Sequence, residues 1–231
     1  MAKKPTVPLK VTAKLIDGRI NSSNGLLMLD SILYHAWFIK HAPHVLEGRG
    51  DARYDGNIGL PLRQLPGNRW FASKGIYEEV EQGIEFINKR PDFFGADKTD
   101  FLDAEKGIIC QTAGKYRAYR IPNIVRTIKG GVIIFYAVGH RKEVEEMLNL
   151  IPSVGKKYAA GFGKVREWIV EEVDNDYTLW HPDYGLMRPL EVGSDEAVGL
   201  DLKDYPILPY CTKPPYWKAK NRRLCYVPIK Y

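Results

Sequence analysis

The sequence contains few cysteines and no long apolar segment, and these absences narrow the class of protein. Only three cysteines occur among 231 residues, and they lie far apart without a C-x-x-C spacing. This pattern argues against a disulfide framework and a zinc site, so we expect no metal and no cofactor. No run of about eighteen apolar residues could cross a membrane, and residues 1–5 lead directly into polar, strand-like sequence. We therefore expect a cytoplasmic protein without a membrane partner.

Acidic residues are absent from two long stretches of the chain. Residues 110–130 and 209–231 contain no aspartate or glutamate, whereas residues 171–204 form an acidic counterweight. The whole chain carries a net charge of +6. Because soluble surfaces usually intersperse the two signs, this segregation indicates a face that binds a polyanion.

A glycine-rich, basic loop at residues 151–165 is the most informative motif. Gly155, Gly161 and Gly163 permit backbone conformations closed to other residues and would let main-chain N–H groups face anionic oxygens. The lysines that would supply the charge are Lys156, Lys157 and Lys164. The loop therefore predicts a site for a phosphate backbone, although a tight loop with solvated lysines would have the same sequence.

This loop lacks the features of two common nucleotide-binding motifs. No Lys-Ser or Lys-Thr pair follows its last glycine, which excludes a P-loop. It also does not open a helix after the first strand, which excludes a dinucleotide-binding fingerprint.

The apolar periodicity predicts a mixed α+β core. In chain order we expect a strand at 8–17, a helix at 29–40, a strand or bent pair at 108–128, a strand at 132–138, a helix at 141–150 and a strand at 164–173. This βαββαβ order is that of a ferredoxin-like (RRM-like) core, in which helices cover one sheet face and the other face can meet RNA.

We expect one domain over residues 1–231, with two additions to the core. The expected parts are a core at about 8–42 and 105–174, a partly helical insertion at about 43–104, and an aromatic, basic C-terminal extension at about 175–231. The insertion offers one helix at 73–88, capped by Ser73. The extension has too many aromatic residues for a disordered tail, so it should pack on the core as irregular structure and short strands.

Both additions contain basic residues next to aromatic ones, a mixture suited to nucleic acid. The possible contacts are Arg63, Arg69 and Lys74 in the insertion and Lys218, Lys220, Arg222 and Arg223 in the extension. The aromatic pair Trp70 and Phe71 could instead form a plug under a loop, and Trp217 is expected to anchor the extension to the core.

The loop Gly155-Lys156-Lys157-Tyr158-Ala159-Ala160-Gly161-Phe162-Gly163, between the second helix and the last strand, resembles the RAMP superfamily of CRISPR-associated proteins. Within it, the helix start at 29–33, the segment 116–120 and the residues around Trp180 look most like the type IV Csf subunit that caps the 5′ handle of the guide RNA. The resemblance covers roughly residues 8–40 and 108–190.

The resemblance implies a role, a site and partners. In that family the glycine loop and nearby basic residues grip the repeat-derived handle, and a protruding insertion intercalates at the guide–target duplex. The implied RNA-binding residues are Gly155, Lys156, Lys157, Gly161, Gly163 and Lys164, with Arg117, Arg120 and Arg126 as additions. The implied partners are the guide RNA, the backbone and large subunits of the effector complex, and target DNA reached through that complex.

Three functional hypotheses follow. The first is a non-catalytic RNA-binding subunit of a type IV CRISPR ribonucleoprotein. The second is a metal-independent endoribonuclease that processes the guide RNA, for which His35 on the first helix is the catalytic candidate, although a lone histidine there could simply be packed or solvated. The third is a structural adaptor whose basic faces dock acidic protein partners.

Overall fold

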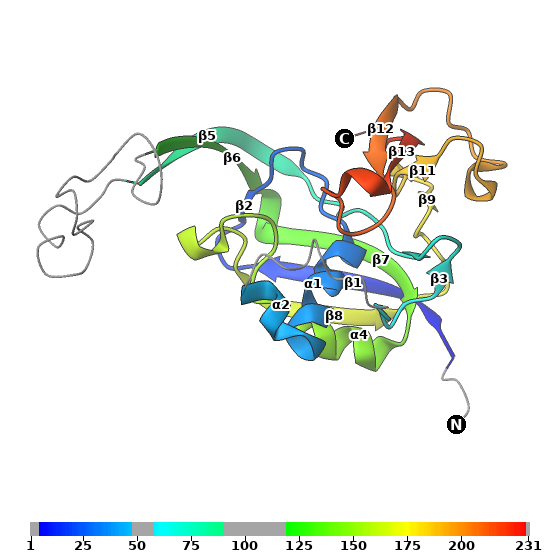
Figure 1. Ribbon diagram of the computed structural model, residues 1–231, viewed down its shortest axis with the longest axis horizontal. Coiled ribbons are helices and arrows are strands. Elements are labelled where there is room, and N and C mark those ends of the chain that lie inside the picture. The colour runs from blue at the N-terminus through cyan, green and yellow to red at the C-terminus, as the bar shows by residue number, and fades with distance from the viewer. Residues whose placement is uncertain (1–4, 48–57, 90–118, 230–231) are drawn as a thin grey trace, which may run out of the picture.

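The core of the protein is a three-stranded antiparallel sheet covered on one face by helices (Figure 1). The computed structural model describes residues 5–47, 58–89 and 119–229. Strand β1 (Val7–Leu15) lies between β7 (Val132–Gly139) and β8 (Val165–Glu172) and is antiparallel to both. The predicted mixed α+β fold is confirmed.

Alternation along β1 explains how the sheet acquires its two faces. Leu9, Val11 and Ala13 are fully buried beneath the helices, while the residues between them face the other way. On that second face Lys14 pairs with Glu167 on β8 at 2.9 Å. The second sheet face therefore carries charges of both signs that partly neutralise one another.

Two helices lie over the sheet and match the predicted ones closely. Helix α1 (Leu29–His41) buries Leu33, Ala36 and Trp37, and helix α4 (Arg141–Leu148) buries Val144 and Leu148. Both helices therefore present apolar residues at the spacing of one helical face to the same core. A short helix, α2 (Pro43–Glu47), follows α1. None of the helices among the described residues is long and apolar enough to span a membrane.

The outer edge of β7 is paired only intermittently. Isolated bridges join it to Leu62, Ala72 and Ile76, and the small hairpin of β3 (Gln64–Leu65) and β4 (Arg69–Trp70) interrupts this segment. The strand predicted before β7 does not fill this position, because β6 (Tyr119–Ile128) belongs to another sheet, ordered β2-β6-β5. The complete four-stranded ferredoxin-like sheet is therefore not confirmed.

A tight backbone crossing turns the chain from β6 into β7. The connecting 3-10 turn, Lys129–Gly131, has positive φ at both glycines, and Gly131 passes so close to Gly18 that a side chain would meet backbone. The Ile128 N–H donates to the carbonyl oxygen of Gly18 at 2.8 Å. The Gly-Gly pair thus redirects the chain between two sheets and does not close a hairpin.

The second sheet projects from the body as a ribbon. Strand β5 (Glu79–Lys89) pairs with β6 along its length, and β2 (Arg19–Asn21) pairs with the base of β6 (Figure 1). The predicted helix at 73–88 is wrong, because its second half is this strand. Ser73 is not a helix cap: its hydroxyl donates to the carbonyl of Lys74 and accepts from the N–H of Tyr136, both at 2.8 Å.

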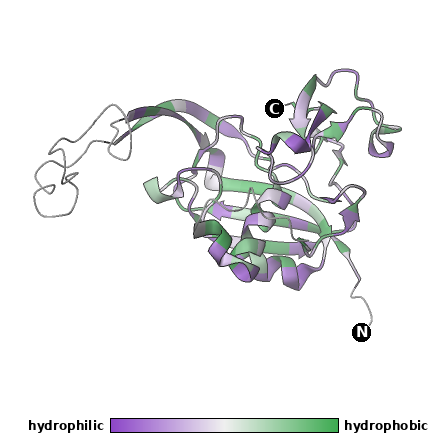
Figure 2. Ribbon diagram, in the orientation of Figure 1, coloured by the Kyte–Doolittle hydropathy of each residue, from purple (hydrophilic) through white to green (hydrophobic). Residues whose placement is uncertain are grey.

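The C-terminal extension folds as short strands beside the core, as predicted. Strand β13 (Arg222–Tyr226) lies between β11 (Leu190–Glu191) and β12 (Ile207–Cys211), and a small hairpin of β9 (Trp180–His181) and β10 (Gly185–Leu186) precedes them. A separate apolar cluster holds the extension together; its buried members are Leu186, Leu190, Leu202 and Tyr205. Figure 2 shows hydrophobic residues along the core strands and also along the projecting ribbon.

Candidate nucleic-acid interface

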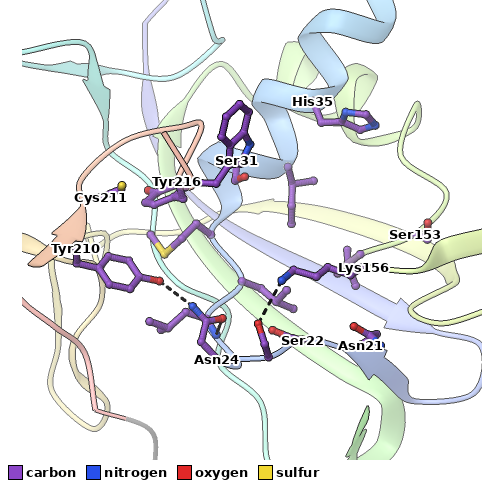
Figure 3. Close-up of a pocket in the computed structure, with 18 of the residues that line it drawn as sticks. Asn21, Ser22, Asn24, Ser31, His35, Ser153, Lys156, Tyr210, Cys211 and Tyr216 are labelled. Carbon is purple, nitrogen blue, oxygen red and sulfur yellow. Dashed lines mark hydrogen bonds between the residues drawn. The ribbon is translucent and has the colours of Figure 1, made fainter. Parts of the chain in front are cut away.

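A cleft of about 460 Å³ lies where the glycine loop, the start of α1 and the β12–β13 hairpin meet (Figure 3). The predicted site residues that line it are His35, Gly155, Lys156 and Arg222. They come from three parts of the sequence, and the fold brings them to one place. The other predicted residues lie elsewhere and are considered below.

The glycine loop is held against β2 through its backbone. The N–H of Lys156 donates to Asn21 O at 2.8 Å, and the N–H of Gly163 donates to Arg19 O at 2.7 Å. Gly163 has φ +67°, and a Cβ there would overlap the carbonyl oxygen of Val154. Only glycine fits this approach of two backbone segments.

This docking changes the expected role of the glycines. The N–H of Gly163 donates to the carbonyl oxygen of Arg19, and the N–H of Gly161 donates to the carbonyl oxygen of Tyr158 at 2.9 Å. These two N–H groups are therefore committed within the protein. The exposed groups of the loop that remain for an anion include the side chains of Lys156, Lys157 and Lys164.

The turn between β2 and α1 contributes polar side chains to the lining of the cleft. The Lys156 Nζ donates to the hydroxyl of Ser23 at 3.2 Å, and the Asn24 side-chain amide donates to the hydroxyl of Tyr210 at 3.0 Å (Figure 3). Amide and hydroxyl groups both donate and accept hydrogen bonds, so these side chains can pair with base edges or a 2′-hydroxyl. Sequence reasoning missed the Asn21-Ser22-Ser23-Asn24 turn, whose run of small polar residues was the available signal.

Trp217 does not have the anchoring role expected from the sequence. Its side chain is 59% exposed and lines the cleft, so it presents an aromatic surface to solvent. The neighbouring Tyr216 is the anchor instead. Its hydroxyl contacts both carboxylate oxygens of Asp30, on α1, at 2.9 and 3.0 Å.

A buried ionic cluster fixes the extension to the core beneath the cleft. Arg188 and Asp30 are both fully buried, with 3.6 Å between Arg188 Nη2 and Asp30 Oδ2. Arg188 also donates to the carbonyls of Trp70, Ala72 and Thr212. The cluster joins helix α1, the insertion and the extension through a single guanidinium group.

Burial controls the ionisation of this cluster. It raises the pKa of Asp30 from 3.8 to about 6, while the Arg188 charge and the Tyr216 hydroxyl oppose that rise. Burial likewise raises the pKa of Tyr216 well above its usual value, and the Asp30 charge adds to the effect. Arg188 thus provides the charge that keeps a fully buried carboxylate ionised near neutral pH.

Residues 7–228 match the family described as CRISPR type IV associated protein Csf3. The chain belongs to this family. The predicted resemblance to a type IV Csf subunit is thereby confirmed, and no curated protein matches the chain.

Two solved structures of type III CRISPR complexes are distantly similar to this Csf3 family chain. The first is the type III-B Cmr-beta complex bound to cognate target RNA, at 11% identity and a TM-score of 0.32, covering 73% of this chain and 61% of that one. The second is the Csm3-Csm4 subcomplex of the type III-A interference complex, at 11% identity and a TM-score of 0.39. This match covers 95% of this chain and 90% of that one. The chain thus spans about three fifths of the Cmr-beta relative.

Three of the predicted contacts in this Csf3 family chain point into the protein. Arg126 is buried and donates to Glu79 at 2.6 Å and to Gln82 at 2.6 Å. Lys74 is buried with its Nζ donating to Ile229 O at 3.0 Å, and burial lowers its pKa to about 8. Arg69 pairs with Glu196 at 2.6 Å and is only 11% exposed. These residues hold elements together and do not line the cleft.

The remaining predicted contacts are spread over other surfaces. Arg120 lies on the ribbon, 4.0 Å above the ring of Phe86, and Arg63 lies 4.6 Å above the ring of Phe71. Lys220 and Arg223 are exposed on the extension, and Lys218 is partly buried there. The predicted contact Arg117 falls outside the described residues. No cluster of three or more metal-ligating side chains occurs within the described ranges.

Proposed function

We propose that this Csf3 family chain is an RNA-binding subunit of a type IV CRISPR ribonucleoprotein and that it holds the repeat-derived 5′ handle of the guide RNA in the cleft. The observation that carries the proposal is the convergence of Lys156, Arg222 and Trp217 on one cleft that also contains polar side chains. Two cations and an exposed aromatic ring around hydrogen-bonding groups match the chemistry of a single-stranded nucleic acid.

Each part of the cleft has a defined task in this proposal. Lys156 and Arg222 neutralise backbone phosphates, and Trp217 stacks on an unpaired base. The exposed Ser23 and Asn24 of the turn at 21–24 offer a hydroxyl and an amide to base edges and 2′-hydroxyls. Lys157 and Lys164 extend the positive surface beyond the cleft along the glycine loop.

The projecting ribbon is the proposed contact with neighbouring subunits. Ile84 is 63% exposed and Phe86 is 49% exposed on β5, and Ile121 on β6 is 38% exposed. Exposed apolar groups along a ribbon are typical of interaction surfaces. The backbone and large subunits are the proposed protein partners, and target DNA is reached through the assembled complex.

The test measures the affinity of the full chain for labelled repeat RNA as a function of salt. The Lys156→Ala/Arg222→Ala variant should bind more weakly, and its slope of log affinity against log salt should fall by about 0.7 for each lost contact. Lys142→Ala/Arg166→Ala removes two exposed charges, from α4 and β8, away from the cleft, and serves as the matched control. An equal loss in the control would show that only overall charge matters.

One observation favours the endoribonuclease as a second candidate. His35 is exposed and lines the same cleft as Lys156, where an RNA backbone would pass. Metal-free cleavage of repeat RNA by the protein, lost in His35→Ala, would establish that activity. Purified protein that carries no RNA and binds none would instead support the adaptor.

A further inference from the structure

A second basic hollow lies on the other side of the β12–β13 hairpin. It has a volume of about 320 Å³ and lies between the hairpin and the turn at 66–69. Its lining includes Arg69, Lys213 and Arg223, with Glu191 as the acidic member. This hollow shares no lining residue with the cleft.

Positive charge is concentrated in this hollow. Arg69, Lys213 and Arg223 line it together. The pKa of Lys213 is lowered by burial and by the charges of Arg223, Lys220 and Arg69. Glu196 pairs with Arg69, while Glu191 lies 3.9 Å from Arg223 Nε. The cations therefore exceed the carboxylates around the hollow.

Two of the cations are held in place, and Arg223 remains at the surface. Lys213 Nζ donates to Gly67 O at 2.6 Å, and Arg69 Nε donates to Pro66 O at 2.9 Å. Arg223 is 52% exposed, and its Nη1 donates to the carbonyls of Lys220 and Arg222. These contacts orient the Arg223 guanidinium and leave its Nη2 edge for an anion.

Strand geometry separates the two basic sites. Successive side chains of a strand point to opposite faces, and on β13 Arg222 lines the cleft whereas Arg223 lines the second hollow. The hairpin therefore presents one cation to each side. A nucleic-acid backbone that crosses the hairpin would meet both.

We propose that the second hollow is a phosphate-binding subsite that takes a backbone phosphate of a nucleic acid through Arg223 and Lys213, with Arg69 supplying charge behind them. A guanidinium group beside an ammonium group matches the geometry and charge of a phosphodiester. The subsite requires that the chain binds nucleic acid, but it depends neither on the cleft nor on the identity of the guide handle.

The experiment compares Arg223→Ala with the neighbouring Arg222→Ala in the full chain. Each variant is titrated with single-stranded repeat RNA and with duplex DNA over a range of salt. Arg223→Ala should reduce the salt slope by about 0.7 for the RNA or about 0.9 for the duplex without changing the melting temperature. The nucleic acid whose slope changes identifies the strand that occupies the subsite.

Further variants distinguish charge from shape. Arg223→Lys should retain the salt slope, and Arg223→Glu should weaken binding more than Arg223→Ala. An unchanged slope for both nucleic acids with Arg223→Ala and with Arg223→Glu would overturn the proposal. If Lys156→Ala/Arg222→Ala binds normally while Arg223→Ala does not, the cleft fails as the handle site and the subsite stands.

The last part of the experiment tests the binding of inorganic phosphate. It is titrated into the wild-type chain while the amide signals of Gly67 and Thr212 are followed by NMR, because both residues line the hollow. Shifts that disappear in Arg223→Glu support the subsite. Such shifts together with unchanged nucleic-acid slopes would make it a site for small phosphate ions and would refute the backbone assignment.

Discussion

Replacing Arg188 by methionine should lower the melting temperature of the protein, and the size of this loss should depend on pH. The substitution leaves Asp30 buried without its cation and leaves the carbonyl groups that Arg188 contacts without a donor. Breaking a buried ion pair by removing one partner costs about 3–5 kcal/mol. In a domain of this size each kcal/mol lowers the melting temperature by about 2–4 °C, so the loss should be about 6–20 °C.

The pH dependence follows from the carboxyl group that is left behind. Burial already raises the pKa of Asp30 to about 6, and loss of the Arg188 charge raises it further. A folded state whose acid has a raised pKa binds its proton more tightly than the unfolded state, so stability falls as the pH rises through the folded-state pKa. The loss of stability that Arg188→Met causes relative to the wild type should therefore be smaller at pH 5 than at pH 8.

Thermal unfolding of four proteins isolates this interaction. Wild type, Arg188→Met, Asp30→Asn and the double variant form a cycle in which the double variant should lose less than the sum of the single variants. Arg166→Met, at an exposed position on β8, is the surface control. A deficit no larger than that of Arg166→Met, or one that does not change with pH, would refute the reasoning.

Three further outcomes are expected. Gly163→Ala should lower the melting temperature by several degrees and more than Gly161→Ala does, because a Cβ at Gly163 overlaps backbone whereas Gly161 has open space and only a positive φ of +95°. Arg126→Met should cost about 1–3 kcal/mol in urea unfolding, since it leaves the carboxylate of Glu79, which is 25% exposed, without its buried cation. Trp217→Ala should weaken RNA binding by about 1–3 kcal/mol in a titration while the melting temperature stays unchanged, because the ring is exposed in the cleft.

Local periodicity predicted the elements whose buried face is also their apolar face. Strand β1 and helices α1 and α4 each present that face to one core, so a short window of sequence contains the necessary information. Strand β5 was missed for the opposite reason. Its stability comes from pairing with β6, which lies tens of residues further along the chain, and its apolar residues Val80 and Ile84 also fit helical spacing.

Charge density along the sequence indicated Lys156, which lines the cleft, but it did not predict the placement of every arginine. Arg126 lies in a stretch without acids, yet Glu79 on the neighbouring strand pairs with it across the sheet. The opposite orientations of Arg222 and Arg223 required knowing that these residues form a strand. A variant that changes both arginines therefore alters two different surfaces, and their roles must be measured separately.

The glycines of the loop show why the same residue pattern supports two physical interpretations. A glycine indicates that something approaches the backbone closely, and the sequence does not state whether that is a ligand or another part of the chain. A Cβ added at Gly155 would lie 2.8 Å from the carbonyl oxygen of Asn21. A Cβ added at Gly163 would overlap the carbonyl oxygen of Val154. These contacts fix the base of the loop and thereby position Lys156 over the cleft. Phosphate binding at this loop should then depend on lysine side chains, so it should weaken steeply with added salt.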